Sequence, residues 1–533
     1  MRPLLVGPLL ALLVLVPTAT AQGHEGHTHS HAHRDTTAAP AHGHDAPHPH
    51  DGLRAAESDR IPPEWFMDVG PTTSHDHGAH GEAPATSHEH AAAGHPNATH
   101  GAATGSSHEH GTEGGAASTG MSSAFLPGAP MTRDGSGTAW LPDAAPMEAA
   151  HGAAGGWHLM LHGAVFPRFT ASDAFGSGSR GASGFGAPNW AMGMAQRPVG
   201  AGQLTARAMV SLDPLIEGGD GYPLLFQTGE TFEGEALVDR QHPHDFFSEL
   251  SVAYAHRLGR AASAFAYLAY PGEPALGPVA FMHRPSARFS PDSPLGHHWQ
   301  DATHIVFGVV TLGLATGPFK LDASVFTGRE PNEERYGFDR PRFDSYSARL
   351  SVNPSPRWAL QVSRGFLREP EAVEPGVDVW RTTASALYSA PVARGGDFSA
   401  ALVWGLNDHG PSPDPGDHHH TGAQHALLGE AALRLGPQAV YSRAEFAQKS
   451  AAELALDPHA YEEERFDVLS LTLGTARELA ALRGVSVMLG GQGSVYAVPE
   501  ALRSLYGEFP VSLQVFLRLA PGRMAHEGAH AHH

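Results

Sequence analysis

Histidine is the residue of this chain whose number and spacing could do chemistry. Of the 38 histidines, 18 fall between residues 22 and 150, in repeats such as His-x-His and His-Glu-His among Ala, Gly, Ser, Thr and Pro. Neutral imidazoles on a flexible chain bind Zn²⁺, Cu²⁺ or Ni²⁺ with high capacity and low specificity. The predicted ligands of this diffuse tract are His24, His27, His29, His31, His33, His42, His44, His48, His50, His75, His77, His80, His88, His90, His108 and His110. We expect labile Zn²⁺ or Cu²⁺/Cu⁺, lost below about pH 6 as imidazoles protonate, and no tightly bound cofactor.

A second candidate metal site lies in two polar segments further along the chain. Residues 239–245 carry the His-Pro-His motif, and the long connection from Tyr270 to Thr303 is of a length that is commonly functional in a compact domain. The candidate ligands are His242, His244, His283, His297, His298 and His304, with Asp245 and Asp301 beside them. A metal needs three or four ligands that converge within about 2.0–2.2 Å. The alternative is that these histidines bond carbonyls and carboxylates in a rigid loop plug.

A third group combines sulfur with imidazole: Met147, His151, His158, Met160 and His162. Thioethers with imidazoles suit copper, above all Cu(I), although methionine is also an ordinary packing residue. Two further histidine-rich segments, residues 408–425 and the tail that ends in His532 and His533, repeat the composition of the tract. Each of these two segments alone is also typical of a solvated polar loop.

The ends and composition of the chain exclude several classes of protein. Residues 1–21 predict a secretory signal, with Arg2, an apolar run and a small-x-small site at Ala19-Thr20-Ala21. There is no cysteine, so disulfides, thiolate metal sites, iron–sulfur clusters and cysteine nucleophiles are excluded. The net charge of −21 argues against a nucleic-acid partner. No run of about 20 apolar residues follows the leader, which argues against helical membrane spans.

Composition divides the remaining chain into four parts. Residues 22–120 are poor in aromatic and β-branched side chains and are predicted to be disordered. Residues 121–156 are not of low complexity and predict an irregular segment that packs on or in a barrel. Residues 157–520 predict the barrel itself, and residues 521–533 form a histidine-rich tail.

Alternation of apolar and polar residues dominates from residue 157 onward. Phe319, Leu321 and Val325 alternate with Lys320 and Asp322. Similar runs of roughly ten residues, separated by Gly, Pro, Asn and Asp, are typical of an antiparallel transmembrane β-barrel. We predict an all-β fold with about 16 strands, 14–18 being compatible with the spacing. A large soluble sandwich or propeller is the alternative fold.

Side chains of the polar face indicate what fills such a barrel. They include Arg207, Lys320, Asp322, Arg349, Gln361, Gln514 and Arg518. Many others are Gly, Ala, Ser or Thr, which predicts a wide lumen that contains water and is narrowed by the 271–304 loop. Aromatic residues at strand ends, among them Trp358, Trp380 and Tyr388, suit the girdles at a membrane interface.

In this pattern the chain resembles Gram-negative outer-membrane barrels of the porin-like class over residues 157–520. The resemblance implies a place in the outer membrane, contact with its lipid, and a homotrimer. It departs from the class at its end, because a tail to His533 follows the last predicted strand instead of a terminal aromatic residue.

These features together predict an outer-membrane barrel that binds, buffers or transports a transition metal such as zinc or copper, and that is not an enzyme. One alternative is a generic porin or structural outer-membrane protein with a solvated histidine-rich linker. A second is a barrel hydrolase with His162, His256 or His304 as base, although no serine stands in a convincing nucleophile motif.

Overall fold

The computed structural model describes residues 120–176, 178–411, 422–457, 461 and 465–522. The sixteen predicted ligands of the N-terminal tract lie outside these residues, as do His418, His419 and His420 and the C-terminal tail. The predicted signal peptide and disordered segment fall there too, and they stay predictions.

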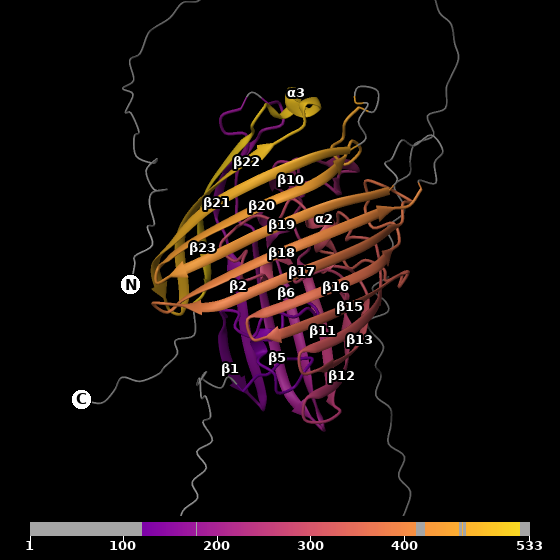
Figure 1. The fold of residues 1–533 in the computed structure, drawn as a ribbon, viewed down its shortest axis with the longest axis vertical. Coiled ribbons are helices and arrows are strands. Elements are labelled where there is room, and N and C mark those ends of the chain that lie inside the picture. Colours follow the sequence, from indigo (N-terminus) through magenta and orange to yellow (C-terminus); the bar gives the residue numbers. More distant parts are fainter. Residues whose placement is uncertain (1–119, 177, 412–421, 458–460, 462–464, 523–533) are drawn as a thin grey trace, which may run out of the picture. The chain divides into compact units, whose positions relative to one another are not determined.

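The described chain forms a closed antiparallel barrel of 16 strands, which confirms the predicted fold class and strand number (Figure 1). The barrel strands are β2 (Trp157–Val165), β5 (Asn189–Val199), β6 (Gly202–Val210), β11 (Phe247–Arg257), β12 (Ala262–Ala269), β13 (Val309–Thr316), β14 (Phe319–Phe326), β15 (Ser345–Ser355), β16 (Trp358–Leu367), β17 (Val379–Val392), β18 (Gly396–His409), β19 (Gly422–Leu435), β20 (Gln438–Ser450), β21 (Arg465–Leu482), β22 (Val485–Ala497) and β23 (Val511–Pro521).

The remaining elements are short. They are η2 (Met131–Arg133), β1 (Ala150–Ala154), β3 (Arg168–Ala171), β4 (Ser183–Gly186), α1 (Asp213–Ile216), β7 (Tyr222–Pro223), β8 (Glu230–Phe232), β9 (Glu235–Leu237), β10 (Arg240–Gln241), η3 (Phe281–His283), α2 (His297–Gln300), η4 (Ala302–His304), η5 (Glu500–Leu502) and α3 (Arg503–Tyr506). Within the described ranges, no helix has the length and apolar character needed to cross a bilayer.

The barrel closes between its last strand and the first hairpin. β23 pairs with β3 over Leu513–Phe516 and reaches β2 at Leu519, which lies opposite Val165. Pro167 separates β2 from β3, and Pro188 separates β4 from β5, because proline has no N–H to give to a ladder. The carbonyls of both prolines still accept backbone hydrogen bonds. The Leu517 N–H donates to the Pro167 carbonyl at 2.8 Å, and the Phe166 N–H donates to the Pro188 carbonyl at 3.0 Å.

The two faces of the sheet are inverted relative to those of a water-soluble protein. On β14 the apolar Leu321 is 56% exposed, whereas Lys320 and Asp322 are each 1% exposed. The same holds on β21, where Leu473 is 59% exposed and Thr472 is 7% exposed. Such a continuous apolar outer surface is stable in lipid and would drive aggregation in water. It therefore confirms the predicted place in the outer membrane.

Aromatic side chains mark both edges of this apolar surface. Trp358 packs on Tyr388 at 4.9 Å near one end of the barrel, and Phe366 packs on Trp380 at 5.4 Å near the other. Trp358 and Phe366 lie eight residues apart on β16, roughly 27 Å of strand, which a tilt of about 40° reduces to roughly 21 Å. That span approaches the apolar band of about 25 Å in outer-membrane barrels.

Connections at the two ends differ in length. One end has tight turns, of which residues 155–156, 200–201 and 317–318 are examples. The other end has long connections, such as 211–246, 270–308, 327–344 and 368–378. In outer-membrane barrels the short turns face the periplasm and the long loops face outward.

Residues 120–149, here called the N-terminal plug, lie inside the barrel toward its short-turn end. Ser122 donates its backbone N–H to Gln196 at 2.9 Å, and Arg207 donates to the Gly137 carbonyl at 2.6 Å. Glu148 accepts from Arg518 at 2.6 Å and from Arg434 at 3.2 Å. The plug is thus bound to the barrel wall by charged side chains of the lumen face.

Residues 270–308, here called the inward loop, occupy more of the interior. Arg284 donates to Glu430 of β19 at 2.8 Å, and Gln514 of β23 donates to Asp292 at 2.7 Å. The lumen is therefore not wide along the described part of the chain, contrary to the prediction, since Arg349, Gln514 and Arg518 are at most 4% exposed. The polar wall instead makes hydrogen bonds to segments of the same chain, which alternation alone does not distinguish from contact with water.

Candidate metal centre

Five of the six predicted loop histidines come together inside the barrel. His242 and His244 follow β10, while His297, His298 and His304 come from α2 and η4 of the inward loop. The ring centroids form a chain of neighbours: His242–His298 6.0 Å, His298–His297 5.4 Å, His297–His304 5.1 Å and His304–His244 5.5 Å. His242, His297, His298 and His304 are each at most 9% exposed.

These rings surround a space of ionic size, here called the histidine cavity. Its volume is about 20 Å³, and its walls include His242, His244, His297 and His304. Glu230, Asp245 and Glu330 add carboxylates to the same walls, and Arg335 of the lining pairs with Glu230 at 3.1 Å and with Asp245 at 3.3 Å. Such a volume holds one water molecule or one ion, and imidazole with carboxylate is a donor set for a divalent first-row metal.

Hydrogen bonds fix the ring orientation of three of these histidines. The Nδ1 atom of His244 lies 2.8 Å from Asp213, that of His297 lies 2.7 Å from Asp301, and that of His304 lies 2.8 Å from the Asp301 carbonyl. Each contact assigns the proton to Nδ1, because the oxygen can only accept. In the described structure the buried Nε2 atoms of His244 and His304 have no hydrogen-bond partner. An oxygen on Nδ1 and a lone pair on Nε2 are what a metal-binding histidine requires.

The backbone allows the inward loop to sit this close to the wall. Gly405 of β18 lies against α2, and a Cβ there would be 2.3 Å from the Trp299 carbonyl oxygen. Gly229, at φ +104°, lies against the His298 ring, and a Cβ there would be 2.4 Å from its Cε1 atom. Both positions therefore require glycine.

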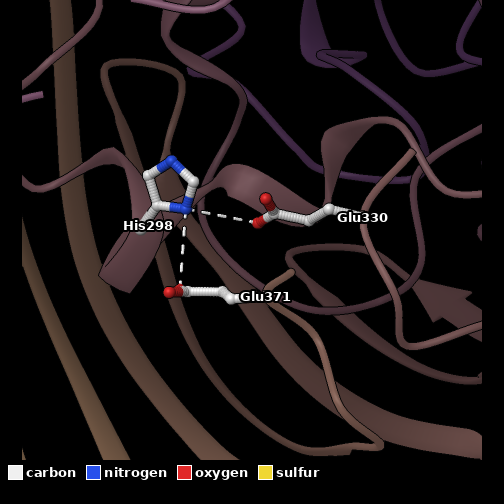
Figure 2. A group of neighbouring side chains, drawn as sticks. All are labelled: His298, Glu330 and Glu371. Carbon is white, nitrogen blue, oxygen red and sulfur yellow. Dashed lines mark ion pairs between the residues drawn. The ribbon is translucent and has the colours of Figure 1, made fainter. Parts of the chain in front are cut away.

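A pair of carboxylates meets His298 beside the histidine cavity (Figure 2). The His298 Nδ1 atom lies 3.3 Å from Glu330 and 3.6 Å from Glu371. One ligand atom from each of the three residues lies within 4.8 Å of the others, and all three side chains are buried. Two long connections supply the glutamates, and they are joined by the Glu330 N–H, which donates to the Pro370 carbonyl at 3.0 Å.

Charge balance at this triad favours a cation. Burial alone would lower the pKa of His298, but the nearby Glu330 and Glu371 carboxylates raise it to about 10. Burial raises the pKa of Glu330 to about 7, against the opposing effect of His298. In Glu371 the effect of burial is outweighed by the neighbouring His298, which holds the pKa of Glu371 below its ordinary value. The proton on His298 thus supplies positive charge beside two carboxylates. A metal ion bound to the three side chains would supply that charge in place of the proton.

The other predicted histidines lie elsewhere. His283 is apart from the five and packs against His162 at 5.4 Å and Trp190 at 4.6 Å. His409, at the end of β18, reaches Glu374 at 3.8 Å, and His425 accepts from the Trp404 indole at 3.2 Å.

Sequence reasoning missed Glu330, Glu371 and Asp213, all of which contact the cluster. Both segments contain an Arg-Glu-Pro motif: Glu330 is its glutamate in Arg329-Glu330-Pro331, whereas Glu371 directly follows the motif of residues 368–370. That shared context is the only local signal in these two segments, and loops with Arg, Glu and Pro are common. Their proximity to His298 depends on folding of three separate connections.

Comparisons with known proteins give a likeness of shape only. No protein-family profile matches the sequence, and no curated protein matches it. Among solved structures, the anion-selective porin from Comamonas acidovorans is 12% identical with a TM-score of 0.43, covering 68% of this chain and 99% of that one. OmpF of Salmonella typhi in complex with daunomycin is 9% identical with a TM-score of 0.43, covering 70% and 100%. A loop-deletion mutant of OmpT, an outer membrane protein of Vibrio cholerae, is 7% identical with a TM-score of 0.41, covering 68% and 99%. The solved structures that this chain resembles are thus of the class that its strand pattern predicts, and at these values they carry no inference about what it binds.

Proposed function

We propose that this outer-membrane barrel binds a divalent transition metal, Zn²⁺ or Cu²⁺, in the histidine cavity. The observation that carries the proposal is the pair of buried, unpartnered Nε2 atoms of His244 and His304, whose Nδ1 atoms are each bound to an oxygen. An unpaired buried nitrogen costs about 1–3 kcal/mol, and a bound metal removes that cost.

The filled interior favours this function over that of a generic open porin. In an open porin the lumen-facing arginines and lysines are in water, whereas here Lys320 and Arg349 are each 1% exposed and bonded to the plug and its neighbours.

The histidine tract has a role in the same proposal. The described chain begins at Gly120, against the His158 ring at the short-turn end of the barrel. Short turns face the periplasm. We propose that the tract collects or buffers metal on that side through many weak sites, in addition to the tighter site of the histidine cavity. Homotrimer formation stays a prediction.

A competition titration of the full-length protein in detergent tests the interior site. Zn²⁺ and Cu²⁺ are added in the presence of a chromogenic chelator that outcompetes isolated imidazoles. The double variant His244→Gln/His304→Gln is expected to weaken the first bound equivalent by 100-fold or more, because two of its ligands are gone. Weak multisite binding by the tract remains.

The matched control is His256→Gln/His425→Gln, which removes two described histidines that do not line the histidine cavity. It should leave the first equivalent unchanged. Equal affinities in the two double variants would show that the interior histidines only support the loop, and would leave metal binding to the tract.

A further inference from the structure

A second cavity, lined by sulfur, lies between the N-terminal plug, the inward loop and the barrel wall. Its volume is about 150 Å³. We call it the methionine cavity, after six lining residues: Met131, Met147, Met160, Met192, Met194 and Met282. His162 and His283 border the same space.

Strand register places these ligand types in two rows on the lumen face. Met160 of β2 lies opposite Met194 of β5, and His151 of β1 lies opposite Met160 on its other side. In the next row His162 lies opposite Met192. Directly opposed residues have Cβ atoms about 4.5–5.5 Å apart, which is within reach of a shared ion for side chains as long as methionine.

The plug adds sulfur from the other side. Met131 and Met147 of the N-terminal plug pack against Met160 and Met194 in one cluster. Methionine is flexible and can fill gaps, so packing alone would account for one or two of these residues. Six thioethers around one cavity exceed that need, because leucine would fill the same volume with a better-defined conformation.

Unpartnered imidazole nitrogens provide an independent observation. The Nε2 atom of His162, which borders the methionine cavity, is buried and makes no hydrogen bond within the described structure. The same holds for both ring nitrogens of His151, which does not line the cavity but lies opposite Met160. The ring of His162 lies 5.4 Å from that of His283, and Trp190 covers both. Buried polar atoms without partners point to a ligand that the chain itself does not supply.

Charge decides which ion fits. The carboxylates that line the methionine cavity already have cationic partners, since Asp134 lies 3.8 Å from Arg207 and Glu148 lies 2.6 Å from Arg518. Three arginines also line the cavity, and each is paired with a carboxylate: Arg284 with Glu430, Arg288 with Asp397 and Arg518 with Glu148. The remaining donors, thioether and imidazole, are neutral. The desolvation cost of an ion grows with the square of its charge, so a monovalent ion pays about a quarter of the cost of a divalent one. Soft neutral donors also prefer Cu⁺ to Zn²⁺.

We infer that the methionine cavity is a site for a soft monovalent metal ion, Cu⁺ or Ag⁺, held by Met160, Met194 and the imidazole of His162. It is separate in donor chemistry from the histidine cavity and does not require metal there. His244 lines both cavities, so it is the residue through which the two sites adjoin.

X-ray absorption of the full-length protein loaded with one equivalent of Cu⁺, and in parallel of Ag⁺, tests the inference. The chain contains 12 methionines and no cysteine, so any first-shell sulfur comes from methionine. We expect sulfur in the first shell of the wild type, and its loss in Met160→Leu/Met194→Leu with at least a tenfold weaker Ag⁺ affinity. Leucine preserves volume, so the barrel should fold, as heat-modifiable migration on gels verifies.

Met488→Leu is the matched control, because Met488 is equally buried on β22 but belongs to a different cluster. It should keep both the sulfur signal and the affinity. Only nitrogen and oxygen neighbours in the wild type, or sulfur retained in the Met160→Leu/Met194→Leu variant, would overturn the inference. The Zn²⁺ affinity of the histidine cavity should be the same in all of these variants. This measurement distinguishes a failure of the inference about the methionine cavity from a failure of the proposal about the histidine cavity.

Discussion

His244 and His304 lie 60 positions apart in the sequence, yet their rings lie 5.5 Å apart and each is held at Nδ1 by an oxygen. One ring follows β10 and the other comes from the inward loop. The relationship shows that two separate connections of the barrel meet in its interior, each with the orientation of its histidine ring fixed by a hydrogen bond.

Asp301 should be required for tight binding although it does not line the histidine cavity. Its carboxylate accepts from His297 at 2.7 Å and from Arg284 at 2.7 Å, and its carbonyl accepts from His304. Asp301→Asn leaves the carbonyl but weakens the hold on His297, so we expect about 10–100-fold weaker Zn²⁺ binding in the competition titration. Asp467→Asn, at an exposed hydrogen bond to Gln448, should have no effect. Unchanged affinity in Asp301→Asn would mean that His297 is not a ligand.

Gly229→Ala should disturb the site without removing any donor. The new Cβ would lie 2.4 Å from the His298 ring, at a backbone φ of +104° that L-residues rarely adopt. We expect His298 to move away from Glu330 and Glu371, with a loss of stability of about 1–3 kcal/mol in denaturant unfolding. Gly193→Ala is the control, since no atom lies within 4 Å of its Cβ position. Equal stability of the two variants would contradict the close packing at His298.

Acid should release the N-terminal plug. Burial would raise the pKa of Glu148, but Arg518, Arg288 and Arg434 outweigh it and lower the pKa from 4.5 to about 2. Because the folded-state value is depressed, the stabilisation is complete above about pH 4.5 and is lost as the pH falls toward 2. It amounts to at most about 3 kcal/mol. The protection factors of the plug amides against hydrogen exchange, that is, their rates relative to unfolded amides at the same pH, should fall across that window.

Glu148→Gln provides the comparison for the acid experiment. The variant leaves Arg518 and Arg434 with a neutral partner, so its plug should exchange faster at neutral pH and show little change between pH 4.5 and 2. A wild-type plug that keeps constant protection down to pH 2 would be incompatible with this role for Glu148.

A charge on the outer face should destabilise the barrel in lipid. Leu402 is 61% exposed at the middle of β18, on the face that contacts lipid. Leu402→Arg is expected to cost about 2–4 kcal/mol in unfolding from vesicles, the range for arginine at the bilayer midplane. Phe175→Arg, in the connection between β3 and β4, should change stability by less than about 0.5 kcal/mol. A tolerated Leu402→Arg would place β18 in water.

Much of the fold follows from local pattern. Alternation with period two assigns each side chain of a strand to one face, so the outward Leu321 and the inward Asp322 could be predicted from the sequence of β14 alone. The length of the 270–308 connection and its histidines also indicated a functional inward segment.

The sequence by itself determined the class of fold, the approximate strand number, and which residue types are concentrated in the inward loop, because these depend on periodicity and composition within short windows. Only the tertiary structure decided that His242 and His244 meet the inward loop, that Glu330 and Glu371 meet His298, and that the lumen is filled. Each of these contacts is between segments that are far apart in the sequence, and local propensities do not determine which such segments meet in space. The rows of Met160 with Met194 likewise depend on strand register, which pairing across the whole sheet determines.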